Sequence, residues 1–434
     1  MAFKQVRLGD YYKFEKGLGY KGEFLAEESD VALIGMDSHD EGGGYKENSE
    51  KFYTGPYKPE NVAEVGDVIF AGTEQGFGLL ASPLMVPESD RFSTYLFSGD
   101  VLKAIPLKPD EFSAEYLYNI YRVEIFRTKA AYGDSGTTVR RISNENMGEQ
   151  VVPLPDISTQ LAINEIISLV DQQIANNKAL SKNLEALAQS IFKSWFIDFD
   201  PVHAKKNGEK PFGMDPETTN LFPDVFVESE LGVIPSGWSL KTISEVSETL
   251  LGGTPSRKKE EYWNGSIAWV NSGKVNNFRI TSPSERITNL GLSKSATKLL
   301  PKGTTVIAIT GATLGQFSRL EIDSCANQSV VGIVSSDSIS NEFIYLTIKN
   351  NINRLIEAQT GGAQQHINKE DVNEFLFLYP GVDLVEKFTS QVEPLFNQIS
   401  VILLNNENLE LLLQKILLEL INNPELISDL RDTA

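Results

Sequence analysis

The chain has 434 residues, of which 41% are hydrophobic and 23% charged, values typical of a globular protein with more than one domain. Its formal net charge of −20 argues against a protein that coats DNA by itself, because phosphates attract basic surfaces. No apolar run is long enough to span a bilayer and no signal-peptide core is present, so we expect a cytoplasmic protein without a membrane partner. One cysteine and three histidines exclude an internal disulfide and argue against a metal site.

The charge is unevenly distributed along the chain. Residues 1–150 contain 16 Lys and Arg against 25 Asp and Glu, which gives −9. Residues 238–380 contain 14 against 13, which gives +1. The acidic residues therefore lie mainly in the first part and in the connecting segments. Nucleic-acid binding is allowed through local basic patches or with a basic partner.

Residues 1–155 are expected to form a strand-rich domain, because short apolar runs alternate with Gly, Asn and Pro turns. The clearest strand lies in the glycine-flanked segment 66–76. The segment Gly17–Gly22 has the spacing of a dinucleotide-binding loop, but it lacks the preceding strand and the following helix, so we predict a turn. Arg140 and Arg141 follow a glycine-rich polar loop and are candidates for DNA contacts, because arginine pairs with guanine through two hydrogen bonds.

Residues 156–200 are expected to form a long helix of about 35 residues, because apolar side chains recur at spacings of four and three. The predicted seam consists of Ile163, Ile167, Val170, Ile174, Leu184 and Ile191. Polar residues, Asn177 and Ser181, interrupt it in the middle of the helix. Residues 201–237 follow, and their Pro, Gly and acidic residues predict a linker.

Residues 238–380 repeat the strand-rich pattern, with a second glycine-flanked strand in segment 303–315. Three groups of DNA-binding candidates lie here: Arg257, Lys258 and Lys259 for phosphates; Thr313 on a glycine loop; and Gln364, Gln365 and His366 for base edges. A basic triplet on a surface is often only a solvated face, and that alternative stays open.

Residues 381–434 are expected to form a second long helix whose seam repeats the first. Its predicted seam consists of Phe388, Val392, Leu395, Ile399, Leu409, Leu413 and Ile416. Asn406 interrupts it in the middle, where an antiparallel pair would bring it together with Asn177 and Ser181. Aligning Ile142 with Ile367 gives an offset of 367 − 142 = 225, and the same offset relates the two helices. This duplication predicts an α+β fold in which two similar strand-rich α/β domains are related by an approximate two-fold axis. The helices would form an antiparallel coiled coil between them; two amphipathic helices in a globular core are the alternative.

The motifs of common enzymes are missing from the sequence. It has no phosphate-binding Gly-Lys-Ser/Thr loop and no Asn/Asp-Pro-Pro-aromatic motif of amino-methyltransferases. His39, His203 and His366 lack a nearby nucleophile or carboxylate constellation. We therefore expect no catalytic residue and no metal in this chain.

Several segments are similar to the specificity subunit of type I restriction-modification systems. They are residues 154–163, 190–202, 230–238, 252–256, 262–265 and 310–315, and the resemblance covers nearly the whole chain. The first domain departs from the family pattern, because Gly72-Thr-Glu-Gln-Gly replaces the Gly-Ala-Thr-Leu-Gly form found at Gly311.

The resemblance implies two target-recognition domains, each reading one half of a bipartite double-stranded DNA target, with an unread spacer set by the helices. It implies two modification subunits that dock on the helices and methylate adenine with S-adenosylmethionine, and restriction subunits that use ATP and Mg. These cofactors would belong to the partners, and this chain would be non-catalytic. Two alternatives remain: an orphan sequence-specific DNA-binding protein, and a coiled-coil assembly scaffold without catalytic partners.

Overall fold

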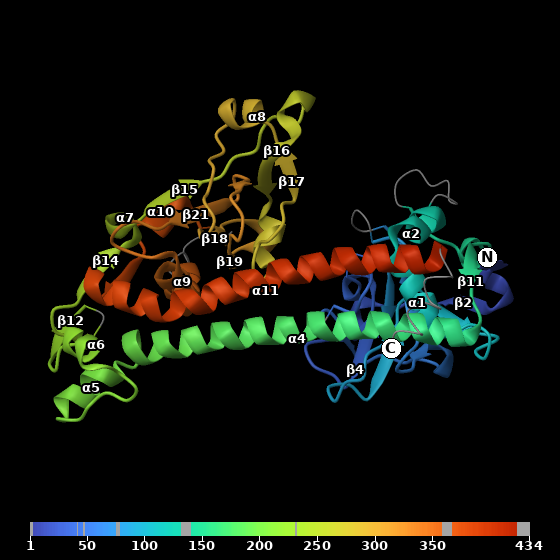
Figure 1. Ribbon diagram of the computed structural model, residues 1–434, viewed down its shortest axis with the longest axis horizontal. Coiled ribbons are helices and arrows are strands. Elements are labelled where there is room, and N and C mark those ends of the chain that lie inside the picture. The colour runs from blue at the N-terminus through green and yellow to red at the C-terminus, as the bar shows by residue number, and fades with distance from the viewer. Residues whose placement is uncertain are drawn as a thin grey trace. The chain divides into compact units, whose positions relative to one another are not determined.

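The computed structural model describes residues 3–40, 42–46, 48–74, 79–131, 140–230, 232–357 and 367–422. The chain separates into two compact units, residues 1–175 with 407–434, and residues 176–406. Each unit contains one strand-rich domain and part of each of two long helices (Figure 1). These helices are α4 (Ile157–Phe196) and α11 (Val382–Asn422), which lie within the ranges expected for them.

The domain of the first unit, the first domain, is built on two sheets. An antiparallel sheet has the order β2 (Tyr12–Lys16), β10 (Val101–Pro106), β7 (Val68–Ala71) and β8 (Pro83–Met85). A second sheet has the order β3 (Leu25–Ala26), β5 (Lys51–Tyr53), β4 (Val31–Ile34), β9 (Thr94–Phe97) and β6 (Val62–Ala63), with β4 and β9 parallel. The pair β1 (Lys4–Arg7) and β11 (Val151–Leu154) leads into α4. The helices of this domain are α1 (Ala114–Arg122), α2 (Glu124–Ala131) and α3 (Asn144–Gly148).

The domain of the second unit, the second domain, has the corresponding elements. Its antiparallel sheet has the order β15 (Glu248–Leu251), β21 (Val330–Val334), β18 (Thr305–Ala308) and β19 (Phe317–Arg319). A smaller sheet combines β17 (Glu285–Ile287), β16 (Trp263–Val270) and β20 (Cys325–Ala326). The pair β14 (Ser239–Thr242) and β22 (Leu376–Tyr379) leads into α11. The helices are α7 (Ile243–Val246), α8 (Asn289–Ser293), α9 (Asn341–Glu357) and α10 (Lys369–Asn373).

The two domains share one topology, as the repeat in the sequence predicts. Both four-stranded sheets place the first strand beside the last and the two middle strands after it. The second sheet of each domain, five-stranded in the first and three-stranded in the second, contains one parallel pair, β4 with β9 and β16 with β20. The short helices α3 and α10 are capped by Ser143 and Asn368, which lie 368 − 143 = 225 residues apart. The duplication therefore extends to the helix caps.

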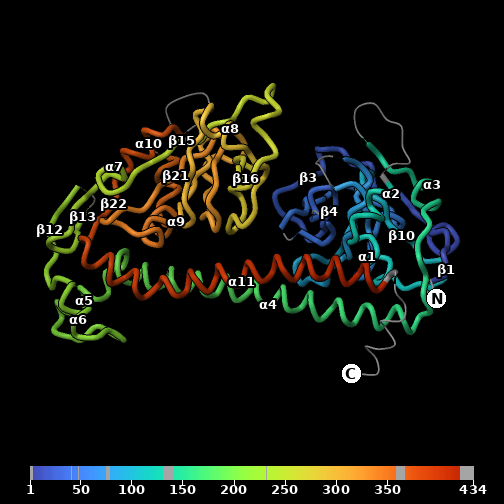
Figure 2. Tube along the Cα trace, turned by 45° about the horizontal axis from the view of Figure 1, so that its top comes forward, coloured from blue at the N-terminus to red at the C-terminus, as the bar shows by residue number. Residues whose placement is uncertain are grey.

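The long helices run antiparallel in each unit, as Figures 1 and 2 show. In the first unit, Ile163 and Ile167 of α4 share a core with Leu413, Leu417 and Leu420 of α11. Residue numbers increase along α4 in the direction in which they decrease along α11, as they do in an antiparallel pair. Full burial of each Leu or Ile side chain stabilises the folded state by about 1.5–3 kcal/mol relative to leaving it exposed. The shared core therefore holds the helices and the first domain together.

In the second unit, Phe192 and Phe196 of α4 pack on Phe388 of α11, with ring centroids 5.7 and 5.1 Å apart. In the middle of the helices the Asn177 side-chain amide donates a hydrogen bond of 2.7 Å to the side-chain oxygen Oδ1 of Asn406. The polar layer that interrupts both seams therefore pairs across the antiparallel helices, as expected.

The buried faces of the helices differ in detail from the predicted seam. Seven predicted residues are buried: Ile163, Ile167, Ile174, Phe388, Val392, Ile399 and Leu413. Six others are only half-buried: Val170, Leu184, Ile191, Leu395, Leu409 and Ile416. The buried positions next to Leu184 and Ile191 are Glu185 and Phe192. A straight helix drifts by about 20° per heptad, and these helices also face the domains, so the buried stripe leaves the strict seam.

The segment 201–237 is not the linker that its composition predicts. It forms α5 (Asp200–Lys206), α6 (Pro216–Leu221), β12 (Phe226–Ser229) and β13 (Gly232–Pro235). Val202, Met214 and Phe222 are buried in the core of the second unit, and the Phe222 ring packs edge-on against Trp195 at 5.3 Å. These apolar residues anchor a segment in which Pro201 and Pro216 lie in the first turns of α5 and α6, and Gly208 and Gly213 have positive φ angles. Within the described part of the chain, no helix is both long and apolar enough to cross a membrane.

Candidate nucleic-acid interface

In the first domain, loops from separate parts of the chain meet beyond one end of the strands of the four-stranded sheet. The Leu18 amide donates to the Phe97 carbonyl at 2.7 Å. The Gly72 amide donates to the Asp100 carbonyl at 3.0 Å, and the Ile142 amide donates to the Gly72 carbonyl at 2.9 Å. These bonds bring the loops after β2, β7 and β9 together with the segment before α3. We call this the first loop edge.

The second domain builds the same edge with the same bonds. The Gly253 amide donates to the Ala326 carbonyl at 2.8 Å. The Ile309 amide donates to the Ser329 carbonyl at 2.9 Å, and the Ile367 amide donates to the Ile309 carbonyl at 3.0 Å. Ile142 and Ile367, the residues that align the repeat in the sequence, thus make equivalent hydrogen bonds. This second loop edge can display different side chains on an unchanged backbone.

A glycine starts the first loop of each edge for a steric reason. A Cβ atom on Gly17 would lie 1.9 Å from the Phe97 carbonyl oxygen, and one on Gly252 would lie 2.1 Å from the Asn327 carbonyl oxygen. Any side chain at either position would push the loop off its neighbour. The segment from Gly17 is therefore the counterpart of the Gly252 loop, which explains a glycine pattern that resembles a dinucleotide-binding loop without being one.

Arg140 and Arg141 lie at the first loop edge, and both are exposed. The Glu74 amide donates to the Arg140 carbonyl at 2.9 Å, and Arg141 forms a β-bridge with Thr73. The Arg140 guanidinium lies 3.6 Å from the Glu74 carboxylate. The two arginines are thus held beside the loop after β7, with their side chains accessible to a ligand.

Arg257 has a different environment from the one its sequence context predicts. Its Nη2 donates to Glu285 Oε1 at 2.7 Å, and the guanidinium centre lies 3.7 Å from the Trp263 ring centroid. The hydrogen bond to the Glu285 carboxylate raises the pKa of Arg257, and the same bond lowers the pKa of Glu285. Arg257 therefore ties its loop to β16 and β17, and its guanidinium is already engaged.

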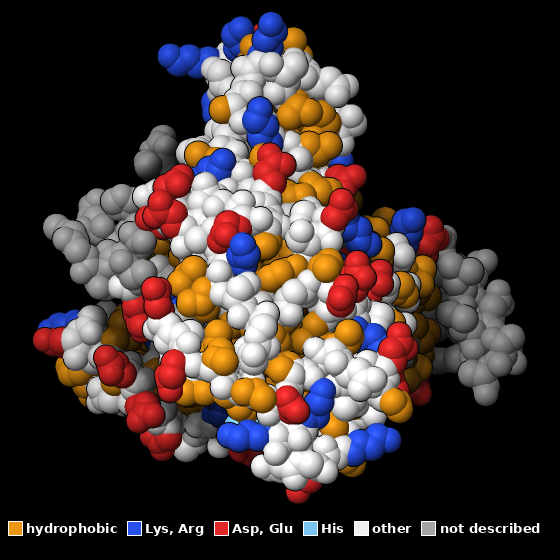
Figure 3. All heavy atoms as spheres, turned by 90° about the vertical axis from the view of Figure 1, so that its left-hand side faces the viewer, with side chains coloured by type: hydrophobic (Ala, Val, Ile, Leu, Met, Phe, Trp, Pro, Cys, Tyr) orange, Lys and Arg blue, Asp and Glu red, His pale blue; other side chains and the backbone are white. Residues whose placement is uncertain are grey.

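Lys258 and Lys259 are exposed beside Arg257. The Lys259 ammonium donates to the Tyr262 hydroxyl at 3.1 Å, and this bond is the main cause of its raised pKa. Figure 3 shows Lys and Arg side chains at the end of the second domain where α8 lies. Lys258 is thus the member of the triplet best placed to meet a phosphate.

Thr313 lies in the 3-10 turn Gly311–Thr313 at the second loop edge, and its hydroxyl donates to the Thr310 carbonyl at 3.4 Å. Gln364, Gln365 and His366 lie outside the described residues. They precede Ile367, whose amide fastens the chain to this edge. Among the described residues, no group of three or more His, Cys, Asp and Glu could hold a metal ion.

Two residues that sequence reasoning missed also lie at the second loop edge. The Thr254 hydroxyl donates to the side-chain oxygen of Gln328, and Gln328 is exposed. Gln328 belongs to a polar run, Asn327 to Ser329, between two buried strands. The signal in the sequence was this polar run between β20 and β21, opposite the glycine loop that contains Thr254.

Residues 235–383 match the family model of the type I restriction modification DNA specificity domain. Over 304 residues the chain is 25% identical to the type I restriction enzyme HindI specificity subunit of Haemophilus influenzae, covering 60% of this chain and 66% of that protein. Over 307 residues it is 24% identical to the MjaIX specificity subunit of Methanocaldococcus jannaschii, covering 70% and 66%. The chain is therefore similar to type I restriction-modification specificity subunits, and its residues 235–383 match their DNA specificity domain.

The similarity to these relatives spans 66% of the length of each. Among solved structures, this chain is similar to the type I restriction-modification S subunit from M. genitalium. The TM-score is 0.47 and the identity 13%, over 96% of this chain and 95% of that one. The matched family domain contains the second loop edge, and the first loop edge is its internal counterpart.

Proposed function

We propose that this chain selects the DNA sequence for a type I restriction-modification enzyme, and that each domain reads one half of a bipartite target. The observation that carries the proposal is the loop edge, which is built twice with equivalent backbone hydrogen bonds and displays different side chains. Arg140 and Arg141 lie on the first edge, whereas Thr254 and Gln328 lie on the second. A target with two different halves requires this combination of a common scaffold and distinct readers.

The chemistry of these side chains suits base recognition. Arginine donates two hydrogen bonds to guanine in the major groove, and glutamine pairs with adenine. Lys258, which has no base-specific chemistry, would contact phosphates and position the domain. Net charge governs nonspecific DNA binding, and the remainder of this chain is acidic. Partner subunits would therefore supply the nonspecific attraction to DNA.

The partners would be two modification subunits, with restriction subunits joining them. Each long helix has a second apolar stripe at seven-residue spacing, Leu180 and Leu187 on α4 and Leu404, Leu411 and Leu418 on α11. These five side chains are 40% to 61% exposed. Exposed leucines at heptad spacing are suited to packing against partner helices. S-adenosylmethionine would be bound by the modification subunits, and ATP and Mg by the restriction subunits.

The test is to map methylated adenines in a genome that carries this chain with its modification subunits. A bipartite motif is expected, and replacing residues 238–380 by those of another family member should change one half of it. The isolated chain is expected to transfer no methyl groups. A motif that does not respond to the replacement would contradict the proposal, as would a sequence-specific footprint that needs no partner. A reader of chromosomal DNA acts where the chromosome is, so a cytoplasmic location remains our prediction.

A further inference from the structure

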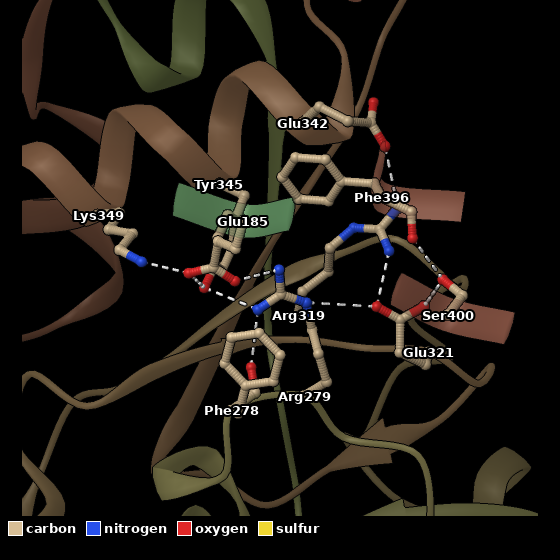
Figure 4. Close-up of polar contacts among 10 residues, drawn as sticks. All are labelled: Glu185, Phe278, Arg279, Arg319, Glu321, Glu342, Tyr345, Lys349, Phe396 and Ser400. Carbon is tan, nitrogen blue, oxygen red and sulfur yellow. Dashed lines mark hydrogen bonds and ion pairs between the residues drawn. The ribbon is translucent and has the colours of Figure 1, made fainter. Parts of the chain in front are cut away.

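A group of charged side chains is buried where the second domain packs against both long helices (Figure 4). Three cations, Arg279, Arg319 and Lys349, face three carboxylates, Glu185, Glu321 and Glu342. Five of these side chains are at most 9% exposed, and only that of Lys349 reaches 27%. We call this group the Glu185 network.

Glu185 is the contribution of α4 and meets three side chains of the second domain. Its Oε2 lies 2.5 Å from Arg279 Nη2. Its Oε1 is paired with the Lys349 ammonium and accepts a hydrogen bond of 3.2 Å from the Tyr345 hydroxyl. Tyr345 and Lys349 lie one turn apart on α9. One carboxylate on the long helix therefore fixes both α9 and the Arg279 loop.

Glu321 connects the domain to the other long helix. Its carboxylate lies 2.8 Å from Arg319 and 3.5 Å from Arg279, and it accepts a hydrogen bond of 2.6 Å from the Ser400 hydroxyl on α11. Arg319 also pairs with Glu342 of α9 at 3.0 Å. The network thus joins two domain loops, α9 and both long helices into one set of contacts.

The physical chemistry of this network differs from that of the surrounding rings. Apolar contacts such as Tyr345 on Phe396, with centroids 5.8 Å apart, lose little when two surfaces slide by a fraction of an ångström. Buried charges are tolerated only while each has its partner, because an unpaired one is strongly unfavourable. The three positive charges balance the three negative ones, and each pair is favourable only while the domain keeps this position on the helices. The network therefore restricts the domain to one angle on the helices.

The first unit contains a reduced version of the same plan. Arg122, the last residue of α1, makes two hydrogen bonds of 2.6 and 2.7 Å to Asp171 of α4. Burial lowers the pKa of Arg122, but the bond to Asp171 and nearby charges, including Glu410, outweigh it and leave the pKa raised. Glu410 lies 410 − 185 = 225 residues after Glu185. An ionic contact between domain and helices therefore occurs in both repeats.

We propose that the Glu185 network is an orientation lock that determines which spacer length between the two half-sites the subunit accepts. The proposal rests on the proposed function, because a spacer exists only for a bipartite target. The helices α4 and α11 enter both units. The angle at which the second domain sits on them therefore decides where its loop edge meets the DNA. A loosened lock would let that edge meet half-sites that are displaced by one base pair.

The experiment uses the complete methyltransferase assembled with wild-type chain or with Glu185→Gln, which keeps the shape of the side chain and removes its charge. Duplexes carry the two half-sites found by methylome mapping, with the native spacer or with one or two base pairs added or removed. The ratio of methylation rates on native and altered spacers is measured. We expect Glu185→Gln to lower this ratio by roughly tenfold or more, equivalent to ~1.4 kcal/mol of discrimination.

Two variants separate orientation from general stability. Lys182→Gln removes an exposed charge from the same helix, and it should leave the ratio unchanged. Val392→Ala weakens the buried core of the second unit without touching the network, and it should lower the melting temperature but keep the ratio.

Lys349→Met removes the most exposed member of the network and should lower the ratio in the same direction as Glu185→Gln, but by less. It provides a test if Glu185→Gln fails to assemble.

An unchanged ratio for Glu185→Gln, or for Lys349→Met if that variant has to be used, would overturn the lock. An equal loss of the ratio with Val392→Ala would also overturn it. If the wild-type complex methylated no bipartite site at all, the proposed function itself would fail. A wild type with a sharp spacer preference that Glu185→Gln retains would refute the lock alone.

Discussion

The two domains share a strand order but are fastened to the long helices by different chemistry. In the first unit one apolar core runs from the sheet through Phe112 and Tyr116 to Ile163 and Leu417 of the helices, with the Arg122 pair at its margin. In the second unit the aromatic core is accompanied by the Glu185 network. The side chains of Arg122 and Asp171 are 12% and 40% exposed, whereas those of Arg279 and Glu185 are 0% and 4%.

The difference shows which parts of the repeat are constrained. The backbone hydrogen bonds of the loop edges are equivalent in both copies, so the scaffold tolerates little change there. The contacts that fasten the domain differ between the copies: apolar packing dominates in the first unit, and buried charge accompanies aromatic packing in the second. The side chains on the loop edges differ most. We interpret this as the result of two copies that share one backbone scaffold and face different ligands.

The largest effect is expected where the aromatic core joins the helices. Phe388→Ala should lower the free energy of unfolding of the second unit by ~3–5 kcal/mol, because the ring is fully buried against Phe192 and Phe196. Hydrogen exchange of the purified chain in urea can resolve the two units. Leu184→Ala, at a half-buried position, should cost less than ~2 kcal/mol. An equal cost for both variants would mean that the buried helix face is assigned incorrectly.

Lowering the pH should destabilise the first unit selectively, which distinguishes it from the second. Burial lowers the pKa of His39 in the first domain to about 4, although the Gly35 and Ile69 carbonyls oppose the shift. The unfolded chain binds this proton near its ordinary pKa of 6.5, so stability is complete above that pH and is lost as the pH falls toward 4. The loss should approach roughly 3 kcal/mol. We expect the exchange of first-domain amides to rise between pH 6.5 and 4 and His39→Gln to flatten that profile; a flat wild-type profile would contradict a buried neutral histidine.

Base reading should be confined to one half of the target. Gln328→Ala should cost about 1–3 kcal/mol at one base position of the half read by the second domain and leave the other half unchanged. Arg141→Ala is the matched variant and should relax only the half read by the first domain. Methylation-motif logos of the assembled complexes measure both effects. The same cost is predicted for Gln364→Ala and Gln365→Ala, and unchanged logos would remove these residues from the interface.

The smallest effect concerns phosphate contacts in the second domain. Lys258→Ala should weaken binding to all sequences alike and reduce the slope of log K against log salt by about one. Arg257→Ala should behave differently, because its guanidinium is held by Glu285 and Trp263, and it should instead disturb the loop. Salt titrations of the assembled complex on specific and random duplexes can compare the two. Identical salt slopes for both variants would place Arg257 among the phosphate ligands.

The sequence predicts well the features that depend on local pattern and repetition. The offset between Ile142 and Ile367 identifies the duplication, and the polar positions Asn177 and Asn406 predict how the helices pair. The exposed arginines at the first loop edge could also be selected, because a glycine loop precedes them.

Features that depend on partners far along the chain could not be predicted. From its local sequence Glu185 is predicted to be a solvated helix residue. Its buried position becomes evident only from its contact with Arg279, which lies 279 − 185 = 94 residues later. Arg257 reads as a phosphate ligand until Glu285 closes on it. The folded segment 201–237 resembles a linker, because the burial of Val202 and Phe222 depends on aromatic residues of α4 and α11. In each case the deciding contact has no signature in the local sequence.

One feature of the strand pairing bears on how such a protein can evolve. Each domain begins and ends in one antiparallel pair, β1 with β11 and β14 with β22, so that its two ends lie side by side. Homologous recombination with crossovers at these two strands would exchange a whole domain as a cassette, without stretching or shortening the chain on either side. The folded segment before β14 would stay with α4, whose aromatic residues it covers. On the proposed function, a single pair of crossovers would replace the sequence that one domain reads and leave the other half of the target unchanged.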